Sequence, residues 1–93
     1  MHPVLTNTVP AGQRPVYGVI VLFDQVFVVR DVTPEVEVYD SNTLKLTDRL
    51  PVDGLVSPAD LTACSQFRCL YIADSSLQEI QRAELTERRR DGR

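Results

Sequence analysis

Short apolar runs separated by polar turns extend through the middle of the chain. Residues 17–22 and 26–30 are apolar almost throughout and rich in valine and isoleucine, whereas residues 35–39 and 44–50 alternate apolar with polar positions. Continuous apolar runs are typical of strands covered on both faces, and alternation is typical of half-exposed strands. Their β-branched residues and short lengths disfavour helices. Residues 17–50 are therefore predicted to form a four-stranded antiparallel meander, with the first two strands buried on both faces and the last two wetter.

The same order of strands begins again after a Pro- and Gly-bearing connector at residues 51–58. Three further strands are predicted, over residues 59–64, 69–73 and 79–85, with a turn at 65–68. No fourth strand is expected, because residues 86–93 are charged, so the second unit is incomplete. A helix over residues 76–90 is the alternative for this end of the chain, since Leu77, Ile80 and Leu85 could share one stripe.

The two units also resemble each other residue by residue. The apolar strand Cys69–Asp74 has an earlier echo in Val26–Asp31, and aligning Arg30 with Asp74 gives an offset of 44 residues. Self-similarity at about 40–50 residues is typical of the blades of a β-propeller.

The strand Leu70–Asp74, its polar turn and the following strand with Ile80 resemble blades of NHL and YVTN-type β-propellers. Residues 37–44 look like the turn between the third and fourth strands of those families, and residues 54–61 look like the start of their inner strand. The chain departs from the pattern at Arg30, which stands where the second copy has Asp74. The Leu77-Gln78-Glu79 segment also replaces the polar residues that the NHL family carries before its next strand.

The resemblance implies an all-β partial propeller with five segments. They are an irregular N-terminal arm (1–16), a first blade (17–50), a connector (51–58), a second, incomplete blade (59–85) and a charged tail (86–93). Closed propellers have about four to eight blades, and repeat units bury their apolar faces against neighbours. We therefore expect either an oligomer that closes a ring or a fragment of a longer propeller. A small β-sandwich with Greek-key crossings is the structural alternative.

The charge distribution argues against nucleic acid as a partner. The net charge is −3, and residues 1–85 hold 6 basic against 11 acidic residues, so the body of the chain repels phosphate backbones. The basic cluster Arg88–Arg90 is interpreted as part of a solvated tail. No run approaches the roughly 20 apolar residues of a membrane span, and residues 1–8 lack the features of a signal peptide. We expect a cytoplasmic protein.

Catalytic chemistry has little support in the sequence. The only histidine is His2, and the four glycines are scattered rather than gathered in a phosphate loop. Glu35 and Glu37 would share one face of a strand and are interpreted as a solvated surface. Cys64 and Cys69 flank a predicted turn and are expected to be free thiols, with a disulfide or a metal site as alternatives. Neither an enzyme nor a cofactor is predicted.

The propeller resemblance places the candidate binding residues on two rims. One rim would gather the polar residues of the connectors: Asp31, Thr33, Asp53, Asp74 and Ser75. The opposite rim would carry Phe67 and Arg68, an aromatic beside an arginine. Turn aspartates more often bond their own backbone than a ligand. We expect a non-catalytic protein-interaction scaffold that binds a protein partner or a second copy through exposed blade faces. The alternative is a fragment of a calcium-dependent propeller hydrolase.

Overall fold

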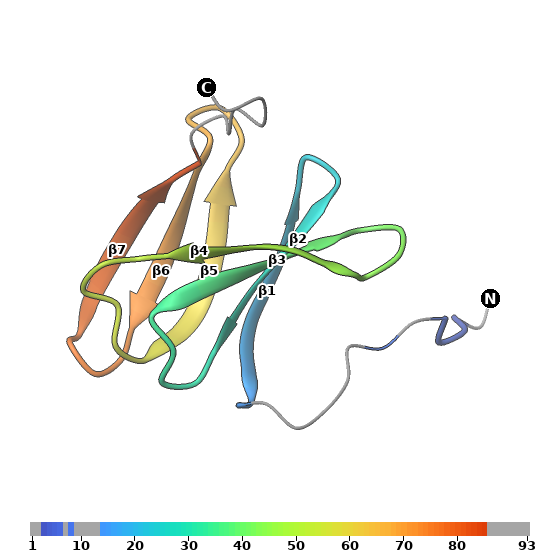
Figure 1. Ribbon diagram of the computed structural model, residues 1–93. Coiled ribbons are helices and arrows are strands. Elements are labelled where there is room, and N and C mark those ends of the chain that lie inside the picture. Colours follow the sequence, from blue (N-terminus) through green and yellow to red (C-terminus); the bar gives the residue numbers. More distant parts are fainter. Residues whose placement is uncertain (1–2, 7, 9–13, 86–93) are drawn as a thin grey trace.

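The computed structural model describes residues 3–6, 8 and 14–85, which form seven antiparallel strands and no helix (Figure 1). The first sheet contains β1 (Val16–Leu22), β2 (Gln25–Arg30), β3 (Glu35–Asp40) and β4 (Leu46–Pro51) in that order. The second contains β5 (Pro58–Cys64), β6 (Cys69–Asp74) and β7 (Glu79–Glu84). Consecutive strands are neighbours in both sheets, which confirms the predicted all-β meander. The helix considered for residues 76–90 is wrong where the structure describes them, because β7 lies there.

The 44-residue repeat is also a repeat of strand pairing. Positions 44 residues apart have partners that are 44 residues apart: Val29 pairs with Val36 as Ala73 pairs with Ile80, and Gln25 pairs with Asp40 as Cys69 pairs with Glu84. Both first strands carry an irregularity at the same place, between Val16 and Gly18 and between Pro58 and Asp60. These first strands are offset by 42 residues, because the β5–β6 turn is longer than the β1–β2 turn.

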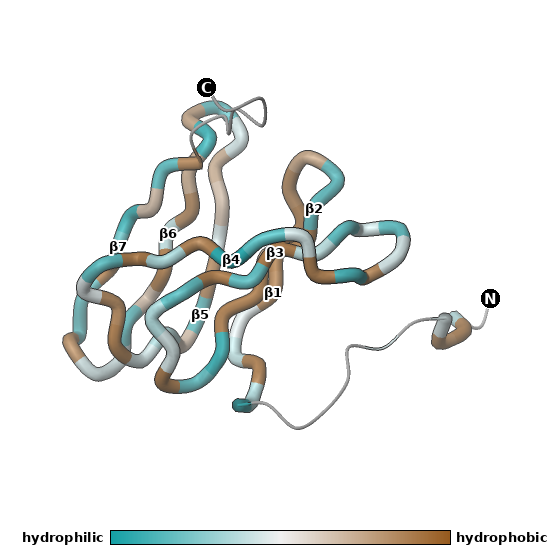
Figure 2. The backbone as a smooth tube through the Cα atoms, viewed as in Figure 1, coloured by the Kyte–Doolittle hydropathy of each residue, from teal (hydrophilic) through white to brown (hydrophobic). Residues whose placement is uncertain are grey.

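The two sheets pack face to face around one apolar core. Phe27, Val29, Val36 and Val38 of the first sheet lie in the same buried cluster as Leu61, Leu70 and Ile72 of the second. We call these the inner faces of the sheets and the opposite sides their outer faces. Burying each such side chain contributes about 1.5–3 kcal/mol, so the contact between the sheets is the main source of stability. Figure 2 shows the apolar residues concentrated on β1, β2 and β6, with β7 more polar.

Gly18 sets the distance between the sheets where β1 lies against β5. A Cβ at this position would lie 2.9 Å from Cγ2 of Val29, 3.0 Å from Cβ of Leu61 and 3.1 Å from the Leu61 nitrogen. Two of these atoms belong to the opposite sheet and one of them is backbone, which cannot move aside without shifting β5. Glycine is therefore the residue that allows this close approach.

The predicted distribution of burial within the first sheet is wrong for two strands. β1, expected to be covered on both faces, is exposed at alternate positions, whereas β3, expected to be half exposed, is buried along its centre. β3 is an interior strand of its sheet, and the charge of its Glu37 is paired, so both of its faces can be buried. β1 has a neighbouring sheet on its inner face, while on its outer face Val19 remains 56% exposed.

Candidate functional site: the outer face of the first sheet

The outer face of the first sheet combines an apolar edge with a polar centre. Two rows of paired residues cross it, Val19–Val28–Glu37–Arg49 and Val21–Val26–Tyr39–Leu46. At the β1 edge, Val16, Val19 and Val21 are 45%, 56% and 62% exposed. We call these three valines the β1 strip. Single exposed apolar residues are ordinary, but a row of them along one strand is typical of a surface that contacts another protein.

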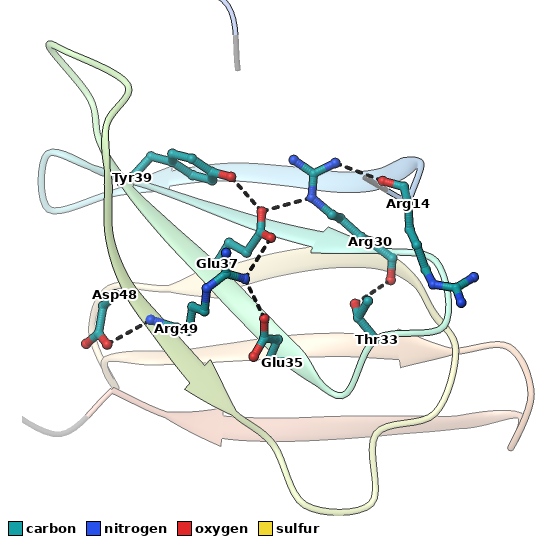
Figure 3. Close-up of polar contacts among 8 residues, drawn as sticks. All are labelled: Arg14, Arg30, Thr33, Glu35, Glu37, Tyr39, Asp48 and Arg49. Atoms are coloured by element: carbon teal, nitrogen blue, oxygen red, sulfur yellow. Dashed lines mark hydrogen bonds and ion pairs between the residues drawn. The ribbon is translucent and has the colours of Figure 1, made fainter. Parts of the chain in front are cut away.

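The Glu37 carboxylate lies at the centre of the polar part of this face (Figure 3). Its Oε1 accepts hydrogen bonds from Nε of Arg30 at 2.9 Å and from the Tyr39 hydroxyl at 2.6 Å. Its Oε2 accepts one from Arg49 at 3.2 Å, and Arg49 also contacts Glu35 at 2.7 Å. The side chains of Arg30 and Glu37 are only 8% and 5% exposed, so this is a largely desolvated ion pair. The prediction of a solvated face is therefore wrong for Glu37.

Burial and pairing act in opposite directions on these groups. Burial favours the neutral form of Glu37, but hydrogen bonds from Tyr39 and Arg30 and the charges of Arg30 and Arg49 outweigh it and lower the pKa of Glu37. Burial likewise opposes the charge of Arg30, and the hydrogen bond and charge of Glu37 outweigh it and raise the pKa of Arg30. Burial and the hydrogen bond to Glu37 raise the pKa of Tyr39. At neutral pH the site holds a charged, hydrogen-bonded pair with a neutral tyrosine.

Arg30 also ties β2 to the chain that precedes β1. Its Nη1 donates to the Arg14 carbonyl at 2.8 Å, and the Asp31 N–H donates to the Pro15 carbonyl at 2.9 Å. The Thr33 hydroxyl donates to the Arg30 carbonyl at 2.9 Å. A buried charged side chain at the end of β2 thus anchors the entry into the first sheet.

Asp74 anchors the entry into the second sheet, as Arg30 does for the first, but with a negatively charged side chain. Asp74 is 1% exposed, and its carboxylate accepts backbone hydrogen bonds from four residues: Val56, Ser57, Ser76 and Leu77. Burial opposes its charge, yet these four bonds outweigh burial and lower the pKa of Asp74. The Ser75 N–H donates to the Ser57 carbonyl at 3.0 Å, the equivalent of the bond from Asp31 to Pro15. Arg30 and Asp74 are equivalent positions of the repeat that perform equivalent tasks.

The residues predicted for the first rim lie at one end of the two sheets. Asp31 and Thr33 belong to the β2–β3 turn, Asp53 to the connector, and Ser75 to the β6–β7 turn beside Asp74 (Figure 1). Asp53 is exposed and Asp31 half-buried, whereas Asp74 and Ser75 bond to the connector backbone. Among the residues that the structure describes, no group of three or more acidic, cysteine or histidine side chains could hold a metal ion.

The opposite rim holds Phe67 and Arg68 in the β5–β6 turn. Phe67 is 60% exposed. The Arg68 guanidinium lies over the ring of Phe23 with 4.4 Å between its carbon and the ring centroid. A cation–π contact of this kind contributes about 0.5–1 kcal/mol at an exposed site. It joins the β1–β2 turn of the first sheet to the β5–β6 turn of the second, so Arg68 already has an intramolecular partner.

A cleft of about 530 Å³ opens between the two sheets on the side of β4 and β7. Its lining includes the apolar residues Val38, Leu50, Leu70 and Ala83 and the acidic residues Asp40, Asp48 and Glu84. Cys64 and Cys69 lie elsewhere: they face each other as a directly opposed pair of β5 and β6, and both are free thiols, as predicted.

Comparison of the chain with protein-family models, with curated proteins and with solved structures found no match in any of the three. Within the described ranges of the chain, no helix has the length and hydropathy needed to cross a membrane. The repeat and the exposed β1 strip are therefore the features of the chain that bear on its function.

Proposed function

We propose that the chain is a unit of a non-catalytic, β-propeller-type protein-interaction scaffold. The repeated meander, the packing of consecutive sheets face to face and the equivalent anchoring by Arg30 and Asp74 support a blade-like interpretation of both sheets. The observation that carries the proposal is the exposure of the β1 strip. Its valines lie on the outer face of the first sheet, and the repeat makes this face equivalent to the inner face of the second sheet, which is buried. The surface of another protein is therefore the kind of partner that suits the strip.

The proposal is tested by placing a photo-crosslinking phenylalanine analogue at Tyr17, which is 51% exposed beside the β1 strip. Irradiation in cells that make the chain is expected to give a discrete protein adduct. Val19→Lys should remove this adduct, because a charged side chain in an apolar contact must be desolvated without a partner. The matched control carries the analogue at Phe67, on the opposite rim. Adducts from Phe67 alone, or adducts from Tyr17 that persist with Val19→Lys, would move the binding surface away from the outer face.

No observation favours the alternative of a calcium-dependent hydrolase fragment. The rim carboxylate with the most hydrogen bonds, Asp74, is buried and occupied by backbone N–H groups. A scaffold is expected to melt at the same temperature with added calcium as with a chelator. A calcium-dependent rise in Tm would instead indicate a cation bound to the folded state and would restore the alternative.

A further inference from the structure

The repeat reveals what kind of surface fits the outer face of the first sheet. Shifting β1 by 42 residues and β2 by 44 places Val19 on Leu61 and Val28 on Ile72. Leu61 and Ile72 belong to the inner face of the second sheet and are 7% and 0% exposed. The outer face of the first sheet is thus equivalent to the inner face of the second sheet, which is already covered within the molecule. The surface that covers this inner face is the inner face of the first sheet.

That covering face has two properties that its partner requires. It carries Gly18, and a Cβ added to this glycine would lie 3.1 Å from the backbone nitrogen of Leu61 in β5. It also presents apolar side chains, among them Ile20 on β1 and Val38 on β3, which pack into the shared core. A sheet that covers the β1 strip in the same way needs a glycine and apolar residues at the same positions of the repeat.

The outer face of the second sheet, which a second copy of this chain would offer, lacks these properties. Gly18 corresponds to Asp60, Ile20 to Thr62 and Val38 to Arg82. In a docked copy, the Asp60 side chain would occupy the position equivalent to Gly18, where even a single added Cβ would collide with the facing strand. Its carboxylate and the Arg82 guanidinium would have to lose their water in an apolar contact, which is strongly unfavourable without partners. A copy of the chain is therefore a poor occupant.

We propose that the outer face of the first sheet docks an antiparallel β-sheet of this same repeat. The docked sheet is not the second sheet of another copy of this chain. The docked sheet has glycine at the position of Gly18 and apolar residues at those of Ile20 and Val38. The inference rests on the proposed function and specifies the partner of that same face. The Glu37 carboxylate lies within the docking surface with hydrogen bonds to both of its oxygens already made, so covering this carboxylate leaves neither oxygen without a partner.

The test builds the missing partner from the protein itself. The donor variant D60G/T62I/R82V gives the outer face of the second sheet the residues of the covering face, and V19K in the same chain disables its own receiving face. The unmodified protein is the acceptor. Light scattering of each alone is expected to show monomers at all concentrations. Their mixture is expected to form a one-to-one complex, because each molecule then has only one competent face.

The matched control replaces the acceptor by the single variant V19K, which is expected to weaken the complex by at least about tenfold. The proposal fails if donor and acceptor do not associate, or if V19K in the acceptor leaves the affinity unchanged. It also fails if the unmodified protein forms oligomers that V19K dissolves, because a second copy is then the occupant. If the donor with its three outer-face substitutions does not fold by circular dichroism, D60G/T62I with V19K serves as the donor.

The two proposals fail separately. A crosslink at Tyr17 that depends on Val19, combined with a folded donor that does not bind, would leave the protein-binding face in place and exclude a sheet of this repeat as its occupant. Binding of the donor without any crosslink in cells would keep the docking geometry and remove the proposed scaffold function.

Discussion

The ion pair between Arg30 and Glu37 is expected to stabilise the fold only as a complete unit. Glu37→Leu would leave the Arg30 side chain, 8% exposed, without the carboxylate that balances its charge, although Arg30 would keep its hydrogen bond to the Arg14 carbonyl. Two unit charges about 4 Å apart attract by about 4 kcal/mol at an effective dielectric constant of about 20. Removing one partner of a buried pair typically costs about 3–5 kcal/mol. We expect a loss in this range, a large part of the about 5–15 kcal/mol that holds a typical domain together.

The matched variant removes the whole unit. Arg30→Met, Glu37→Leu and Tyr39→Phe together delete both charges and the hydroxyl that would otherwise lose its acceptor, while keeping side-chain volume similar. Because desolvating an ion pair roughly cancels its attraction, this triple variant is expected to lie within about 1–2 kcal/mol of the unmodified protein. Urea unfolding followed by circular dichroism measures both. With a slope of about 2 kcal/mol per M, the single variant should unfold about 2 M earlier.

The pH dependence gives an independent check on the same group. The pKa of Glu37 is lowered in the folded state, so its stabilisation is present above the ordinary glutamate value of about 4.3 and is lost as the pH falls through the folded value. The difference between Glu37→Leu and the unmodified protein should therefore shrink in acid. A single variant that costs less than about 1 kcal/mol at neutral pH, or a triple variant as unstable as the single one, would refute the reasoning.

Three further changes test other contacts, each by urea unfolding. Gly18→Ala should cost about 1–3 kcal/mol because its Cβ meets the β5 backbone. Asp60→Ala at the equivalent position removes only the hydrogen bond from the Leu61 N–H to the Asp60 carboxylate and should cost about 1 kcal/mol or less. A loss from Gly18→Ala no larger than that from Asp60→Ala would show that Gly18 does not set the sheet spacing. Asp74→Asn should cost about 1.5–3 kcal/mol at neutral pH. The loss should become smaller as the pH falls below about 4, because the pKa of Asp74 is lowered by folding. A difference in stability between this variant and the unmodified protein that does not change with pH would contradict this expectation. Val32 is half exposed and has a φ of 52°, a left-handed conformation that asparagine adopts more readily than valine. Val32→Asn should therefore raise the free energy of unfolding by about 1 kcal/mol. A lower free energy of unfolding would mean that packing of the Val32 side chain matters more than its backbone conformation.

The amino-acid sequence by itself determined the strands and their order. β-branched runs between turn-forming residues place a strand wherever they occur, because both signals act over a few neighbouring residues. The 44-residue echo between Arg30 and Asp74 also lies in the sequence, and the strand registers repeat it. The positions of Cys64 and Cys69 on facing strands follow from the same local pattern.

Only the tertiary structure decided which faces are covered. Alternation distinguishes the two sides of a strand, but it does not say which side meets another sheet. The apolar run of β1 therefore suggested burial on both faces, although Val19 and Val21 are exposed. The charges of β3 suggested water, although Glu37 is buried against Arg30 and Tyr39. Its burial depends on partners from β2 and β4, which the chain brings together only when the sheet forms.

The same holds for Gly18 and Asp74. In the sequence one is a glycine in a strand and the other an aspartate before a turn, and both have ordinary local explanations. The folded chain makes Gly18 a point of close approach between the sheets and gives Asp74 four backbone donors from two separate segments. Contacts between residues far apart in the chain depend on the packing of whole sheets, and neighbouring residues carry no record of that packing.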